Sequence, residues 1–109
     1  MLSDKTLRLI GLSRGSGGAA CGASALIAAI KRKKCFLAFI ARDCGTSTFD
    51  KFINMCSEHN IPVILCDSKQ ILGSAAGYGE KAVLGITNAS MAQGILAQEK
   101  ENIFSPGSM

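Results

Sequence analysis

Hydrophobic and polar residues alternate along the chain in blocks that predict helices and strands in turn. From Gly22 to Lys33 the sequence is rich in Ala and Leu and ends in basic residues, which favours a helix. Residues 35–41, CFLAFIA, form a continuous apolar run of strand length, typical of a strand buried on both faces. Residues 46–58 then place Phe, Ile and Cys at helical spacing on one face.

Two structures fit the N-terminal segment. A helix that begins at Ser3 or Asp4 would turn Leu7, Ile10 and Leu12 inward. A strand over residues 7–12 fits the same pattern, so both remain open.

The second half of the chain continues the alternation. Pro62 stands at the start of the apolar run IPVILC, where the missing N–H of proline is tolerated in a strand. The further elements that we expect are a short strand at 19–21, a strand at 61–66, a helix from Ser68 closed by Gly77, a strand at 82–86 and a helix at 89–99. Strands that alternate with helices predict an α/β fold, here a three-layer α/β/α sandwich around a mixed, mostly parallel four-stranded sheet.

The glycine-rich segment 14–24, RGSGGAACGAS, has the spacing of a phosphate-binding loop. Ala23 stands where such a loop needs the lysine that neutralises the nucleotide phosphates. Gly15, Gly17 and Ala20 also fit G-x-G-x-x-A, which is a weak signal by itself. Nucleotide binding is therefore the least favoured of the functional hypotheses.

Composition and charge narrow the class of protein. The 109 residues are 48% hydrophobic, which suits one domain over residues 1–109, with flexible ends at 1–4 and 100–109. A net charge of +4 and a pI of about 8.9 favour polyanionic partners, nucleic acid above all. No signal peptide or membrane-spanning run is visible, so we expect a cytoplasmic protein without membrane contact.

The sequence contains no motif that is typical of catalytic or metal-binding residues. The five cysteines contain no CxxC pair and lie mostly in apolar runs, which is typical of small buried residues. Asp43 and Asp67 each follow a predicted strand, where capping of the next helix or turn is favoured over acid–base chemistry. His59, at a helix end, has no nucleophile near it in the sequence. We expect no enzymatic activity, no cofactor and no metal.

Several segments, in order, resemble the L7Ae kink-turn-binding ribosomal-protein family, and most of all its small bacterial ribosomal-protein-like branch. They are the glycine entry to the helix at Gly22, FLAFIARD, CSEHNIPVI, SKQILGSAAG and VLGIT, between Leu7 and Gln98. The resemblance implies an RNA surface made of three parts. These are the loop that enters the second helix, the turn after FLAFIARD and the loop after SKQILGSAAG.

The residues that read bases in this family are only partly present. The family pattern Gly-x-Asn-Glu-x-x-Lys keeps Gly22, but Ser24 replaces the asparagine, Ala25 the glutamate and Ala28 the lysine. Lys69 matches the family's SKQ lysine. The candidate RNA-binding residues are thus Gly22, Ala23, Ser24, Ala25, Ala28, Lys31, Arg32, Arg42, Lys69 and Gly77.

The leading hypothesis is a non-enzymatic protein that binds ribosomal or other structured RNA as a monomer and contacts ribosomal proteins. Its RNA binding is expected to be guided by shape and sensitive to salt, and weak toward a standard kink-turn. The alternative is a protein-interaction module in which Ala25, Ala28 and Ala29 form an apolar helix face.

Overall fold

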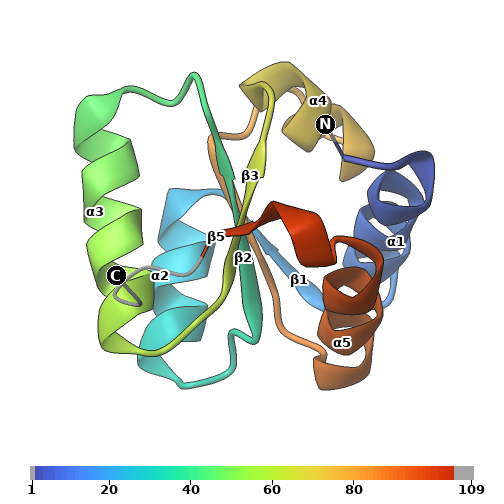
Figure 1. Cartoon of the computed structure of the whole chain (residues 1–109), viewed down its shortest axis with the longest axis horizontal. Helices are drawn as coiled ribbons and strands as arrows, with labels where there is room; N and C mark the ends of the chain where they lie inside the picture. The colour runs from blue at the N-terminus through green and yellow to red at the C-terminus, as the bar shows by residue number, and fades with distance from the viewer. Residues whose placement is uncertain (1, 105–109) are drawn as a thin grey trace.

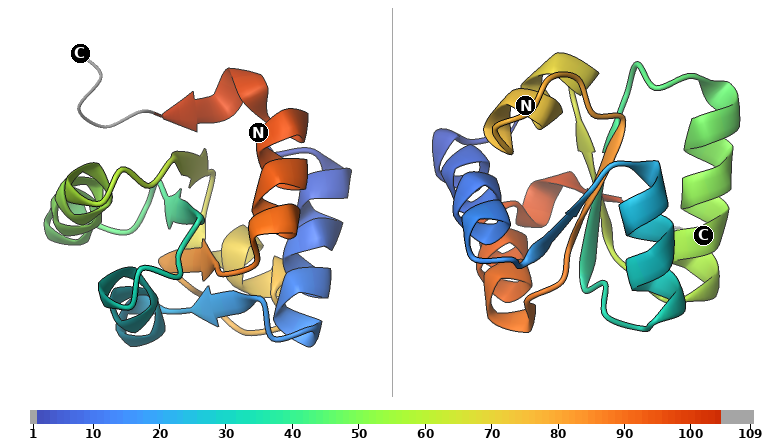
Figure 2. Two further views of the ribbon diagram at one scale, coloured as in Figure 1. Left: turned by 90° about the horizontal axis from the view of Figure 1, so that it is seen from below. Right: turned by 180° about the vertical axis from the view of Figure 1, so that it is seen from behind.

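The computed structural model describes residues 2–104, which form a five-stranded sheet between two layers of helices (Figure 1). Helices α2 and α3 cover one face, and α1, α4 and α5 cover the other (Figure 2). The elements in this part of the chain are α1 (Asp4–Gly15), β1 (Ala19–Cys21), α2 (Ala23–Lys31), β2 (Leu37–Ala41), α3 (Thr46–Glu58), β3 (Val63–Cys66), α4 (Lys69–Ala75), β4 (Val83–Ile86), α5 (Ala89–Gln98), a 3₁₀ turn η1 (Lys100–Asn102) and β5 (Ile103–Phe104). The predicted three-layer α/β/α sandwich is confirmed.

Strand β2 lies at the centre and separates two hydrophobic cores. All five of its residues are buried, as expected for the run CFLAFIA. Phe39 packs with α1, α4 and α5, whereas Ala38 and Ile40 pack with α2 and α3. The period of two in a strand thus divides one apolar run between both faces of the sheet.

The sheet differs from the prediction in strand number and direction. It has the order β1-β4-β2-β3-β5, and only β2 and β3 pair in parallel, whereas the other three pairings are antiparallel. The 13-residue helix α3 carries the chain back along the sheet, so that β3 runs parallel to β2. Helix α4 has only seven residues, about 10 Å, and leaves the chain near the edge where β3 ended. Strand β4 therefore begins at that edge and runs in the opposite direction.

The N-terminal segment is a helix. Of the three residues expected to point inward, the prediction is wrong for one. Ser3 caps α1 by accepting a hydrogen bond from the backbone N–H of Thr6. Ile10 is fully buried and Leu7 is half-buried against the core, but Leu12 is 64% exposed. Residue 12 follows residue 10 by about 200° around a helix, which places it on the outer side.

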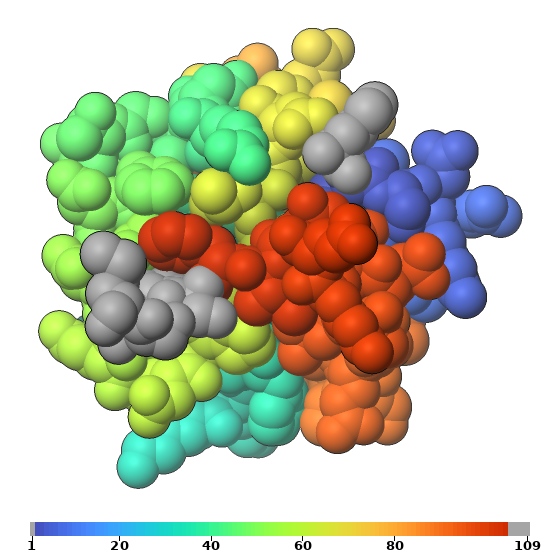
Figure 3. Space-filling model, in the orientation of Figure 1, coloured from blue at the N-terminus to red at the C-terminus, as the bar shows by residue number. Residues whose placement is uncertain are grey.

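Within the described residues, parts of the ends that we expected to be flexible pack against the rest of the fold. Leu2 is buried, and β5 adds to the sheet by pairing Val63 with Phe104 and Ile64 with Ile103. Figure 3 shows this C-terminal segment lying across the front of the molecule, from the α5 side toward the α3 side. The expectation for residues 1 and 105–109 lies outside the described residues.

Glu99 joins the two ends of the fold. Its carboxylate accepts hydrogen bonds from the Ser3 backbone N–H (3.1 Å), the Ser3 hydroxyl (3.0 Å), the Thr6 hydroxyl and the Asn102 amide (2.7 Å). Burial opposes the charged form, but these hydrogen bonds outweigh it and lower the pKa of Glu99. Glu99 is only 4% exposed. Its hydrogen bonds to Ser3 and Thr6 hold the start of α1 against the end of α5.

Glycine is required at one position inside a helix and dispensable at another. A Cβ at Gly73 in α4 would lie 1.5 Å from the carbonyl oxygen of Gly79, whereas a Cβ at Gly94 in α5 would meet nothing within 4 Å.

We expect Gly73→Ala to lower the free energy of unfolding by about 2–3 kcal/mol or more, because a backbone segment must move. Gly94→Ala is expected to raise it by about 0.5–1 kcal/mol through helix propensity. Urea denaturation of both variants tests the pair, and equal effects would contradict this packing.

The hydrogen bonds to Glu99 predict a pH-dependent contribution to stability. Because the folded pKa is lowered, the contribution is complete above the ordinary Glu value of 4.5 and is lost as the pH falls through the folded pKa. Glu99→Gln is expected to cost about 1–2 kcal/mol at pH 7 and progressively less in acid. The difference in unfolding free energy between wild type and variant, followed from pH 7 to pH 3, measures this. A difference independent of pH would contradict the assignment.

Candidate nucleic-acid interface

Three segments that are distant in the sequence meet at one edge of the sheet. Strands β1, β2 and β3 end there and β4 begins there, at the top of Figure 1, and we call it the upper edge. The Gly22 N–H donates to the Val83 carbonyl (3.0 Å), and the Arg42 N–H donates to the Cys66 carbonyl (2.8 Å). The Lys81 N–H donates to the Lys69 carbonyl (3.0 Å). The structure thus gathers Gly22, Arg42, Lys69 and the loop after Gly77.

Two helices open at this edge without a side-chain cap. The N-cap residues of α2 and α3 are Gly22 and Gly45, with φ of 95° and 89°, and neither has a side chain to accept a hydrogen bond. Thr46 and Ser47 are of residue types that commonly cap helices, but both lie inside α3. In contrast, Ser3, Ser68 and Asn88 cap α1, α4 and α5 with their side chains. The free N–H groups and positive dipole ends of α2 and α3 suit an anion.

The start of α2 is exposed and carries small side chains. Ala23, Ser24 and Ala25 are exposed in the first turn, and Ala28 is exposed one turn further along. Ser24 is the one of these four whose side chain can form a hydrogen bond. Ala29 is 8% exposed and packs in the core, so it does not extend an apolar outer face.

The turn between β2 and α3 adds a cation and a shallow hollow. Arg42 is exposed beside a concavity of about 330 Å³ that is also lined by Gly45, Thr46 and Phe49. A guanidinium beside a bare helix N-terminus combines two features that attract phosphate.

An aromatic group that was not expected from the sequence lies at the upper edge. Tyr78, in the loop between α4 and β4, is 43% exposed, and the cationic groups of Arg14 and Lys81 each lie 4.9 Å from its ring centroid. Arg14 Nε also donates to the Tyr78 hydroxyl (3.4 Å). A Cβ at Gly22 would be 3.7 Å from Lys81 Nζ, so this cluster adjoins the start of α2. Its signal in the sequence is the tyrosine between Gly77 and Gly79.

Lys31 and Arg32 do not lie with the other candidate residues. They stand at the C-terminal end of α2, which is about 13 Å long, whereas Gly22 stands at its N-terminal end. The structure therefore divides the candidates between the upper edge and the opposite edge, where α2 and α3 end, which we call the lower edge (Figure 1).

Asp43 caps a helix, but a different one from the helix that follows its own strand. Its Oδ1 accepts the Lys69 N–H at 2.8 Å, so it supports the start of α4. The parallel pairing of β2 with β3 brings residue 43 to that helix.

The cysteines lie in packing positions rather than in a reactive site. Burial raises the pKa of Cys35 to about 11 and that of Cys56 to about 12, which keeps both thiols protonated at neutral pH. Among residues 2–104, no group of three or more His, Cys, Asp or Glu side chains is placed to hold a metal ion. None of the helices in this range is both long and apolar enough to cross a bilayer.

Comparisons with known proteins identify the family. The model of the ribosomal protein L7Ae/L30e/S12e/Gadd45 family matches residues 4–95, and the chain belongs to this family. A similar solved structure is described as that of a protein with unknown function from Bacillus halodurans C. It is 27% identical with a TM-score of 0.82, and the match covers 88% of this chain and 97% of that one. None of the curated proteins matches the chain.

Proposed function

We propose that this protein is a non-enzymatic RNA-binding protein that takes structured, ribosomal or other, RNA on its upper edge. The observation that carries the proposal is the pair of uncapped helix N-termini at Gly22 and Gly45, which open at the same edge. Membership of a ribosomal-protein family supports it. A cytoplasmic location, a monomeric free state and contacts with ribosomal proteins remain parts of the proposal.

The geometry suits a sharply bent RNA backbone. Phosphates approach the free N–H groups of α2 and α3, where Arg42, Lys69 and Lys81 supply positive charge. An unstacked base can stack on the exposed ring of Tyr78. Only Ser24 offers a polar side chain in the first turn of α2. Recognition is thus by shape and charge more than by sequence.

A gel shift with kink-turn RNA and with a plain RNA duplex, at low and moderate salt, tests the proposal. We expect binding whose logarithmic constant falls with salt, with a slope of about −0.7 to −0.9 for each phosphate neutralised. Heparin serves as the competitor, because it has negative charge without RNA shape. A protein with no preference for RNA over heparin would contradict the proposal.

Restoring two side chains tests whether the α2 start contacts the bases. Both positions are exposed, so the variant Ala25→Glu/Ala28→Lys is expected to fold like the wild type. The two substitutions together leave the net charge of the protein unchanged. A gain in affinity would therefore come from base contacts rather than from added electrostatic attraction to phosphate. Each base contact contributes about 1–3 kcal/mol, so the affinity for the kink-turn relative to the duplex should rise at least tenfold. An unchanged ratio, measured by gel shift, would mean that this helix start does not meet the bases.

Tyr78 provides a second test at the same edge. Tyr78→Ala removes the ring and is expected to weaken RNA binding by about 1–3 kcal/mol, the usual contribution of one stacked base. Tyr78→Phe keeps the ring but loses the hydrogen bond from Arg14, so its affinity should stay within about threefold of the wild type. Dissociation constants from fluorescence anisotropy compare the two. Equal losses in both variants would assign the effect to the hydroxyl rather than to stacking.

A further inference from the structure

The lower edge has a concentration of positive charge that the upper-edge proposal leaves unexplained. Lys31, Arg32, Lys33 and Lys34 are consecutive and all four are exposed. Between Asp4 and Asp43 the sequence contains no acidic residue, so none near them in the chain offsets this charge. A solvated helix end needs only one or two cations to complement its dipole.

Helix α2 ends with the same backbone hydrogen bonds as three other helices, but the residue at its left-handed position is of an unusual type. Helices α1, α2, α3 and α4 all close with the same pair of backbone hydrogen bonds, as in Lys34 N–H to the Ala29 carbonyl and Lys33 N–H to the Ile30 carbonyl. In each case one residue takes the left-handed conformation. These residues are Gly17 (φ 79°), Lys33 (φ 60°), Asn60 (φ 56°) and Gly77 (φ 80°).

Lysine is the disfavoured residue in this set. Glycine adopts a positive φ without steric cost and asparagine tolerates it, whereas a lysine Cβ meets the backbone. A strained residue persists where the surrounding structure requires it, and such residues cluster at functional sites. The strain at Lys33 therefore points to a use for its charge, because glycine would close the helix better.

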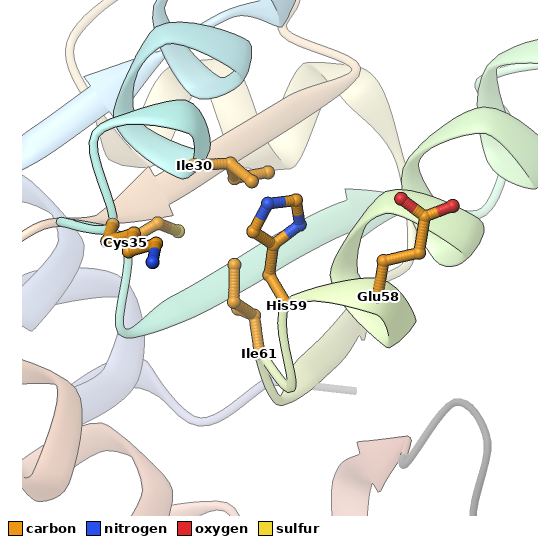
Figure 4. Close-up of a pocket in the computed structure, with 6 residues that line it drawn as sticks. Ile30, Cys35, Glu58, His59 and Ile61 are labelled. Carbon is orange, nitrogen blue, oxygen red and sulfur yellow. The ribbon is translucent and has the colours of Figure 1, made fainter.

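Lys33 borders a hollow between the ends of α2 and α3. The hollow has a volume of about 470 Å³ and is also lined by Ile30, Cys35, Glu58, His59 and Ile61. Figure 4 shows the His59 ring directed toward Ile30, whereas the Glu58 carboxylate points away from it. His59 Nδ1 lies 3.0 Å from the Met55 carbonyl, which only accepts, so Nδ1 donates and Nε2 of the neutral ring can accept a hydrogen bond from a ribose 2′-hydroxyl.

We propose that the lower edge, from Lys31 to Lys34 with His59, is a second RNA-binding surface that holds the phosphate backbone of a separate RNA segment. Helices α2 and α3 present their negative dipole ends here, so the attraction depends on the side-chain cations alone. Such contacts position a backbone without reading its sequence. The inference rests on the proposed function of the upper edge.

The two surfaces face in opposite directions. They lie at the two ends of α2 on a molecule with extents of 29 × 27 × 27 Å. One stiff duplex cannot lie flat against both ends of such a body, so the protein bridges two RNA segments.

A bridging assay tests this inference. Kink-turn RNA is immobilised, the protein is added, and capture of a fluorescent plain duplex is measured. We expect the wild type to capture the duplex. Lys31→Ser/Arg32→Ser/Lys34→Ser should reduce capture at least tenfold and lower the salt slope for the duplex by about 2–3, with kink-turn binding changed by less than threefold. The matched control Lys5→Ser/Lys51→Ser/Lys100→Ser removes equal charge elsewhere and should keep capture.

Lys33→Gly separates binding from folding. It relieves the left-handed lysine, so we expect the melting temperature to rise by about 2–6 °C while duplex capture falls about three- to tenfold. A stabilised variant that captures the duplex as well as the wild type would overturn the inference.

The remaining outcomes distinguish this inference from the proposed function. Binding of kink-turn RNA without capture of a duplex overturns the second surface and leaves the upper edge standing. Failure to bind either RNA overturns both. Equal loss of capture in the lower-edge and control variants overturns the second surface, because net charge alone would then explain it. Displacement of the duplex by poly-L-glutamate as effectively as by unlabelled duplex also overturns it, because an acidic protein would then fit equally well.

Discussion

The close packing of the α4–β4 loop against Gly73 is the constraint on which the rest of the structure depends. The carbonyl of Gly79 lies where a side chain at Gly73 would stand, so the loop folds directly over the short helix α4. The chain then re-enters the sheet at the edge where β3 ended, and β4 runs between β1 and β2 in the opposite direction. The same turn places Tyr78 and Lys81 beside the start of α2. One close backbone contact thus links sheet topology to the assembly of the candidate interface.

The two ends of helix α2 differ in their chemistry. Its N-terminus has glycine as the N-cap and small exposed side chains, so backbone N–H groups are accessible at the surface. Its C-terminus has its last carbonyls partly satisfied by the turn at Lys33, and charge is supplied only by side chains. The first arrangement suits a bent backbone that approaches closely. The second suits a backbone that passes at the length of a lysine side chain.

Local patterns in the sequence predicted much of the fold because they depend on neighbouring residues. The central strand followed from CFLAFIA, and the start of a helix at Ser68 and its closure at Gly77 also agree with the structure. The errors arose where a local pattern has more than one tertiary outcome. Alternation of helices and strands predicted parallel pairing, but the length of α4 changed the direction of β4. The ends were polar and so were expected to be flexible, yet among the described residues Glu99 holds Ser3 and β5 pairs with β3 through contacts across the chain.

The sequence by itself determined the layers, the buried central strand and the family, since the spacing of apolar residues and the order of motifs are properties of the linear chain. Only the tertiary structure decided which cations act together. Lys31, Arg32, Arg42 and Lys69 belong to one candidate set in the sequence, but the length of α2 separates the first two from the upper edge. Arg14, Tyr78 and Lys81 come from remote segments and meet there. The physical reason is that a helix carries its two ends apart by a fixed rise per residue, while strand pairing brings remote loops to one edge.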